Sequence, residues 1–114
     1  MKQEKSITLS IEISENLITN TLESAKSTYW ADVIEYDISG MLLGKENAII
    51  IDESGGDGGA IETHVVTRAM IIDALGILAK KYPKHFADIL AENGDMHTGD
   101  LLIQVAIFGE EKYC

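Results

Sequence analysis

The most apolar stretch of this chain reads Thr98-Gly99-Asp100-Leu101-Leu102-Ile103-Gln104-Val105-Ala106-Ile107-Phe108-Gly109. Thr98 predicts a helix N-cap, because its hydroxyl can accept a hydrogen bond from the first free backbone N–H groups. Asp100 suits the positive end of the helix dipole, and glycine is the residue type that most often follows a helix. The apolar side chains point nearly all round the axis, so we expect this helix to be buried.

Two more helices are predicted just before this stretch. Thr67 fits the N-cap of a helix that runs to about Tyr82, and the apolar residues of this helix leave only a narrow polar stripe. Pro83 fits the first position of the next helix, and Asn93-Gly94 fits its end. The C-terminal half is therefore expected to be helical.

The first half of the chain predicts strands. Residues 6–14 alternate apolar and polar side chains, which is typical of a strand with one buried face. A helix follows from Ser14 to about Lys26 or Ser27. Three further strands are predicted over residues 34–38, 48–53 and 61–65. The expected apolar faces of the first and last strands consist of Ile7, Leu9, Ile11 and Ile13, and of Ile61, Thr63 and Val65.

These elements predict a single α+β domain over residues 1–114. About four strands would form a small antiparallel sheet packed against helices, in the order β-α-β-β-β-α-α-α. Antiparallel pairing is favoured because the connections are short. Met41-Leu42-Leu43-Gly44 fits either a continued strand or a turn.

The glycine-rich residues 54–59 predict a hairpin tip. A phosphate-binding loop needs a following helix and commonly a Gly-Lys pair, neither of which is indicated here. A calcium loop would end on Glu at its twelfth place, where this chain has Thr63. The histidines are not spaced as paired metal ligands, and no Ser or Cys lies in a recognisable catalytic motif. We therefore predict a non-enzymatic protein with no metal, no cofactor and no catalytic residue.

Charge is the most unusual global property. The net charge is −10, from 19 acidic and 9 basic residues, and Lys45 is the only base between Asp32 and Glu62. Such a surface repels nucleic acid and acidic membranes. It fits two interpretations, a solubilising surface, which is the more common case, and a surface that attracts a basic partner protein. No apolar run is long enough for a membrane span, no signal-peptide pattern is present, and the lone Cys114 excludes an internal disulfide. A soluble cytoplasmic protein is expected.

A partner-binding surface is predicted on the acidic strands and an adjacent aromatic pair. Its candidate residues are Tyr29, Trp30, Asp32, Glu35, Asp37, Glu53 and Glu62. Aromatic residues are enriched in protein interfaces, which favours the Tyr-Trp pair. Packing of Trp30 in the core is the stronger of its two interpretations.

Several segments share the pattern of one family. They are Thr21-Leu22-Glu23-Ser24-Ala25 with Tyr29-Trp30, residues 82–93, Thr98-Gly99-Asp100, and residues 104–113. Together they resemble short uncharacterised phage and prophage proteins, which carry Ala-Leu-Glu-Gly-Gly before Tyr-Trp and end on Gln-x-Ala-x-Phe-Gly-Glu-x-x-Tyr-Gly. Ser24-Ala25-Lys26 stands where glycines are expected, and Cys114 replaces the final Gly. The resemblance implies a phage origin and the cytoplasm of an infected bacterium, and transfers no activity.

The leading hypothesis is an acidic phage-type accessory protein that binds a host protein. One concrete version is an inhibitor of a host defence protein, such as an anti-CRISPR, that covers a cationic nucleic-acid site. The alternative is a module that sequesters a small molecule or nucleotide between the aromatic pair and the last helix. A symmetric homodimer through an exposed strand or the apolar helices is a further hypothesis.

Overall fold

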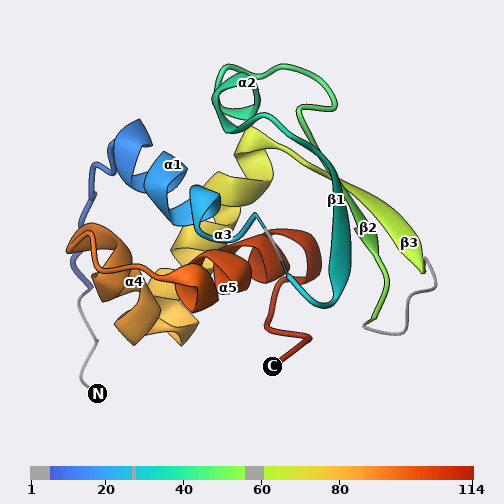
Figure 1. Ribbon diagram of the computed structural model, residues 1–114. Coiled ribbons are helices and arrows are strands. Elements are labelled where there is room, and N and C mark those ends of the chain that lie inside the picture. The colour runs from blue at the N-terminus through green and yellow to red at the C-terminus, as the bar shows by residue number, and fades with distance from the viewer. Residues whose placement is uncertain (1–5, 27, 56–60) are drawn as a thin grey trace.

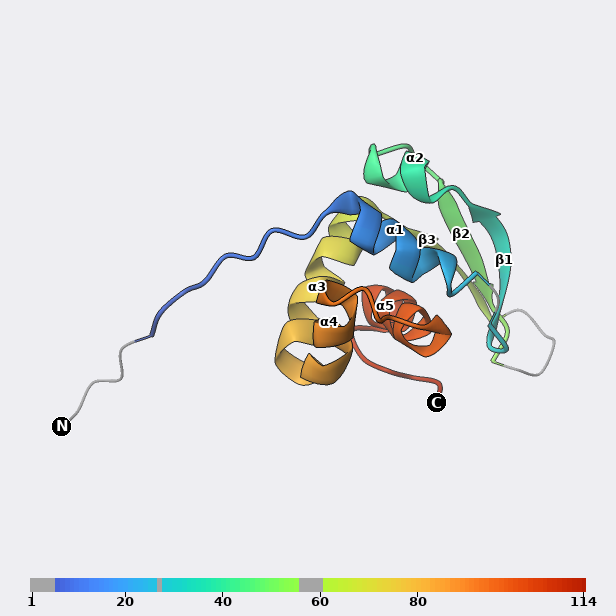
Figure 2. The ribbon, with the colours of Figure 1, turned by 60° about the vertical axis from the view of Figure 1, so that its left-hand side comes forward.

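The computed structural model describes residues 6–26, 28–55 and 61–114, which form an α+β arrangement of a small sheet and five helices. The elements are α1 (Glu15–Glu23), β1 (Ala31–Tyr36), α2 (Ile38–Leu42), β2 (Ile49–Glu53), β3 (Glu62–Val66), α3 (Arg68–Lys81), α4 (Pro83–Leu90) and α5 (Met96–Phe108). The strands form an antiparallel sheet in the order β1-β2-β3. In both ribbon views the long helices lie on one face of this sheet (Figures 1 and 2).

Helix α5 lies at the centre of the core, as its composition predicts. Leu101, Leu102, Ile103 and Val105 are fully buried, and α5 packs against α1, α3, α4 and β3. Its N-terminus runs so close to α1 that a Cβ at Gly99 would overlap the carbonyl oxygen of Thr21. Gly109 ends the helix with φ 78°, the left-handed conformation that glycine adopts without strain. The predicted cap is displaced, because Asp95 rather than Thr98 is the N-cap and accepts from the Thr98 backbone N–H at 3.0 Å.

The other helix signals are largely confirmed. Thr67 caps α3 by accepting from the Met70 backbone N–H, and Pro83 begins α4. Helix α1 ends at Glu23 and α4 at Leu90, each about one turn earlier than expected. The ambiguous residues 41–44 lie in and after the short helix α2, which follows directly from β1 and which strand patterning did not predict. Residues 56–59 of the expected hairpin tip lie outside the described residues, and the strands on either side of the tip do pair antiparallel.

The expected first strand is wrong. Residues 6–13 form an extended arm in which Ile7 and Leu9 are 87% and 81% exposed, and only Ile13 packs against the core. The arm leaves the N-terminus of α1 on the side away from the sheet (Figure 2). Its period-2 pattern indicates an extended segment, but a strand also needs a neighbour with free backbone groups. The sheet therefore has three described strands instead of four.

The predicted inner face of β3 is also wrong. Ile61, Thr63 and Val65 are exposed, whereas His64 and Val66 face the helices. The register with β2 decides this, because Val66 pairs with Ile49 and His64 pairs with Ile51, both of which are buried. One residue of register changes the face of every side chain in a strand.

Candidate functional site

The open face of the sheet carries the acidic residues that the sequence singled out. Asp32 and Glu35 are exposed on β1, and no described element covers this face in either ribbon view (Figures 1 and 2). A β-bulge between Val33 and Glu35 interrupts the alternation of β1 and leaves Ile34 exposed as well. Acidic and apolar side chains are thus mixed on one uncovered surface.

Sheet register adds a residue that sequence reasoning missed. Asp52 of β2 lies directly opposite Asp32 of β1, and its carboxylate accepts a hydrogen bond from Thr63 Oγ1 at 2.7 Å. Like charges directly opposite each other destabilise a sheet. The three described strands contain no Lys or Arg that could neutralise the pair. Only the register between β1 and β2 reveals that Asp52 faces Asp32, and the sequence of one strand does not determine that register.

Two other predicted residues lie apart from this face. Asp37 caps α2 by accepting from the Gly40 backbone N–H at 2.9 Å, and it pairs with Lys45 at 3.3 Å. The backbone hydrogen bond from Gly40, then the one from Lys45, hold the pKa of Asp37 below its usual value. Tyr29 is exposed, but its hydroxyl donates to the backbone carbonyl of Cys114 at 3.1 Å. Both residues have structural contacts within the chain.

Trp30 is fully buried, in agreement with the core interpretation. Its ring stacks on Tyr113 with centroids 5.3 Å apart and packs against Phe108. Its indole N–H donates to Asp100 Oδ1 at 2.7 Å, and Thr28 donates to the same oxygen. Side chains therefore fill the space between the aromatic pair and α5, where the alternative hypothesis placed a ligand.

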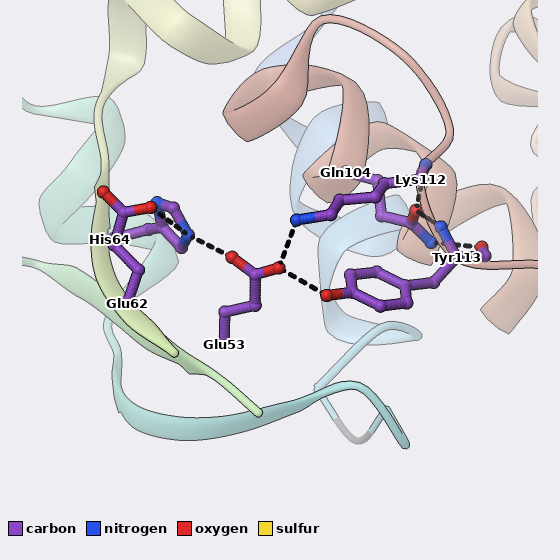
Figure 3. Close-up of polar contacts among 6 residues, drawn as sticks. All are labelled: Glu53, Glu62, His64, Gln104, Lys112 and Tyr113. Carbon is purple, nitrogen blue, oxygen red and sulfur yellow. Dashed lines mark hydrogen bonds and ion pairs between the residues drawn. The ribbon is translucent and has the colours of Figure 1, made fainter. Parts of the chain in front are cut away.

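Glu53 is the centre of a polar cluster on the inner face of the sheet. It is only 1% exposed, although strand patterning placed it on the acidic surface. Its Oε1 lies 2.9 Å from His64 Nε2, and its Oε2 accepts from Lys112 Nζ at 2.6 Å and from the Tyr113 hydroxyl. Figure 3 shows these groups converging on one carboxyl group from β3 and from the C-terminal segment.

The donors around Glu53 keep it ionised in spite of its burial. Burial opposes ionisation, but hydrogen bonds from Lys112, Tyr113 and His64 outweigh it and lower the pKa of Glu53 to about 2. The hydrogen bond between Lys112 and Glu53 raises the pKa of Lys112, and the hydrogen bond between Tyr113 and Glu53 raises the pKa of Tyr113. Because the ionised carboxylate can only accept, the facing His64 Nε2 must carry the proton.

Gln104 of α5 fixes the C-terminal segment from the other side. Its Oε1 accepts from the backbone N–H groups of Lys112 and Tyr113 at 2.8 and 2.7 Å. Its Nε2 donates to the Tyr113 carbonyl and to Asp100 Oδ2. Gln104 is fully buried and all of these bonds lie within the chain, so the cluster clamps the C-terminal segment onto the sheet.

A metal ion is a second interpretation of the same residues. Glu53, Glu62 and His64 have donor atoms within 4.8 Å of one another, and two carboxylates with one imidazole suit Zn²⁺. Glu62 is exposed and lies 3.9 Å from His64 Nε2. However, the ammonium group of Lys112 already supplies a cation to Glu53. The geometry therefore fits a structural clamp better than a metal centre.

A groove of about 380 Å³ lies between the arm, α1 and α3. Its lining is mostly apolar, with Arg68 and Glu15 as its charged groups, and the side chains of Ile11, Ile71, Leu75 and Phe86 contribute to it. Small-molecule sites in proteins have this size and this apolar character. The groove is distinct from the aromatic cluster around Trp30.

Comparison with protein families, with curated proteins and with solved structures finds no match to this chain. Within residues 6–26, 28–55 and 61–114, no helix has the length and apolarity needed to cross a membrane.

Proposed function

We propose that this protein acts by binding a basic surface of another protein through the open face of its sheet. The observation that carries the proposal is the pairing of Asp32 with Asp52 on an uncovered, partly apolar face. This pairing weakens the sheet, so stability does not account for it. A cationic partner would turn the repulsion into attraction, and exposed Ile34 and Val65 would add apolar contact.

The biological context of the proposal comes from the resemblance to phage proteins. A basic nucleic-acid site on a host protein in the bacterial cytoplasm matches the required charge, and a host defence protein would be one such target. The protein would act as an inhibitor by occupying that site and would catalyse no reaction. A net charge of −10 would speed its association with a cationic surface.

The test compares two triple variants with the same change in charge. Asp32→Asn/Glu35→Gln/Asp52→Asn neutralises the open face, whereas Glu46→Gln/Asp73→Asn/Glu92→Gln neutralises three exposed acids elsewhere. Each immobilised protein is incubated with bacterial lysate at ~0.05 M and ~0.5 M salt, since screening grows steeply over this range. We expect wild type and the control to capture the same proteins at low salt, and the open-face variant to lose them.

Two results would contradict the proposal. Capture that persists at high salt would exclude a charge-driven contact. Equal capture by both triple variants would show that the open face is not the contact surface.

The groove along α3 supports a second candidate, a binding module for a small apolar molecule. One cation, Arg68, is a poor match for the phosphates of a nucleotide and a better match for a single carboxylate. Screening of nucleotides and fatty acids by thermal shift would detect a ligand that binds only the folded protein. The shift should disappear in Ile72→Glu at the groove and persist in Ile34→Glu on the sheet; if no compound raises the melting temperature, this candidate fails.

A further inference from the structure

The extended arm, residues 6–13, is a strand without a partner. Within the described part of the chain, no hydrogen bond joins residues 6–13 to any other residue. Ile7, Leu9 and Ile11 form the apolar row of the arm, and each is more than half exposed. Strict alternation over eight residues is suited to a sheet, because only a sheet separates the two rows onto opposite faces.

The sheet of the same chain offers an edge for such a strand. Its two edges are β1 and β3. The bulge at Val33/Glu35 and the acidic side chains of β1 are features that protect an edge from pairing. By contrast, β3 pairs residue by residue with β2 over its full length, so its other side presents a regular row of backbone groups.

Side chains next to the β3 edge match the apolar row of the arm. Val65 is exposed on β3, the outermost strand, and Ile61 is exposed directly before this strand begins. An added strand with its isoleucines on this face would cover them and would extend the apolar contact between Val65 and Ile50, which face each other across β2 and β3.

Charge favours a second copy of this chain as the partner. The three strands carry five acids and no Lys or Arg, whereas the first five residues contain Lys2 and Lys5 against Glu4. With Glu12 of the arm included, the side chains of residues 1–13 carry no net charge, so the added strand brings no further negative charge to the acidic sheet. In each copy the arm leaves on the side away from its own sheet (Figure 2), so the described arm does not pair with the β3 edge of its own chain.

We propose that two copies of this protein exchange their N-terminal arms, so that residues 6–13 of each copy add a fourth strand to the β3 edge of the other. Each copy gives one strand and receives one, which closes the assembly with two-fold symmetry. Addition of a strand to a free edge is an established mode of protein recognition. The acids of β1 on the open face stay accessible in this dimer, whereas Val65 becomes covered. The proposed charge-driven contact does not depend on Val65, so the two proposals are tested separately.

The first test measures molar mass by size-exclusion chromatography with light scattering. Over about 1 to 100 µM, where a micromolar dimer assembles, wild type should reach twice the 12.5 kDa of one chain. Ile7→Lys/Leu9→Lys, which places two charges on the apolar row, should remain at the monomer mass. Thr8→Lys/Ser10→Lys places the same two charges on the polar row and should still dimerise.

The second test examines the acceptor edge. Val65→Lys beside the β3 edge should abolish the dimer, and Ile34→Lys on β1 should not. When the Val65→Lys variant is mixed with the Ile7→Lys/Leu9→Lys variant, the first supplies an intact arm and the second an intact β3 edge. Native mass spectrometry should therefore detect the mixed dimer. Urea unfolding of every variant confirms that it is folded.

Each alternative gives a different result. A wild type that stays monomeric at every protein concentration tested would overturn the proposal. The arm would then pair with its own chain, close over the groove or bind a different protein. A dimer that survives Ile7→Lys/Leu9→Lys would place the interface elsewhere. If Ile34→Lys abolishes the dimer and Val65→Lys does not, β3 is not the acceptor.

Discussion

The buried carboxylate of Glu53 makes the stability of this protein depend on pH in a defined window. Its pKa is about 2 in the folded protein and 4.5 as the ordinary value. Because the folded pKa is the lower one, the contribution is fully present above pH 4.5 and is lost as the pH falls toward 2. At 1.36 kcal/mol per pKa unit, the full contribution is about 3 kcal/mol, of which about 2 kcal/mol is lost by pH 3.

Glu53→Gln isolates this contribution from that of the other carboxylates. At pH 7 the variant should unfold with a free energy about 3 kcal/mol below that of wild type, and the gap should shrink to about 1 kcal/mol at pH 3. Urea unfolding followed by circular dichroism at pH values from 7 to 3 measures both curves. A gap that stays constant across this range would refute the assignment of a low pKa to Glu53.

Two lysine variants check the physical cause. Lys112→Met removes the strongest of the hydrogen bonds that lower the pKa of Glu53 and should weaken the pH dependence while leaving Glu53 in place. Lys45→Met removes an exposed ion pair with Asp37, and such pairs contribute about 0 to 1 kcal/mol. If the two substitutions change the pH dependence of stability equally, the burial of Glu53 does not strengthen its ion pair with Lys112.

Three further predictions concern packing, the clamp and the open face. Gly99→Ala should destabilise the protein by about 1 to 3 kcal/mol, because the new methyl group overlaps the Thr21 carbonyl. Gly76→Ala meets no atom within 4 Å and should stabilise α3 by up to about 1 kcal/mol in the same urea assay; destabilisation there would refute the packing argument. Gln104→Ala breaks three hydrogen bonds to the backbone of Lys112 and Tyr113 and should cost about 2 to 4 kcal/mol, measured by urea unfolding; a loss under 1 kcal/mol would mean that the clamp contributes little. Asp32→Asn should stabilise the sheet by about 0.2 to 1 kcal/mol at low salt and less at high salt, whereas Glu46→Gln in a loop should change little; a salt-independent effect would rule out repulsion from Asp52.

The four longer helices, α1, α3, α4 and α5, could be predicted because their signals are local. Thr67, Pro83 and Gly109 act within one turn of the helix end that each determines, and the apolar content of α5 indicates its burial without knowledge of its neighbours. A local signal can still be displaced by a better one, as when Asp95 takes the cap position expected for Thr98.

The strands and the polar cluster depend on partners that are distant in sequence. Which face of β3 is buried follows from its register with β2, and the polar pattern of Glu62 and His64 gives no hint of it. Glu53 can be buried because Lys112 and Tyr113, about 60 residues later, supply its hydrogen bonds. The pattern of residues 6–13 indicates a strand but does not identify the edge with which it pairs.

The packing of Trp30 gives this protein a built-in optical probe of folding order. It is the only tryptophan in the chain, and its nearest ring neighbour, Tyr113, belongs to the C-terminal segment. Helices and the sequential pairing of β1, β2 and β3 involve near neighbours in sequence, whereas the contacts of Trp30 with Asp100 and Tyr113 close loops of more than 60 residues. Long loops close more slowly than local structure forms. In a stopped-flow experiment, indole emission would therefore time the arrival of the C-terminal segment, while far-ultraviolet circular dichroism times the helices.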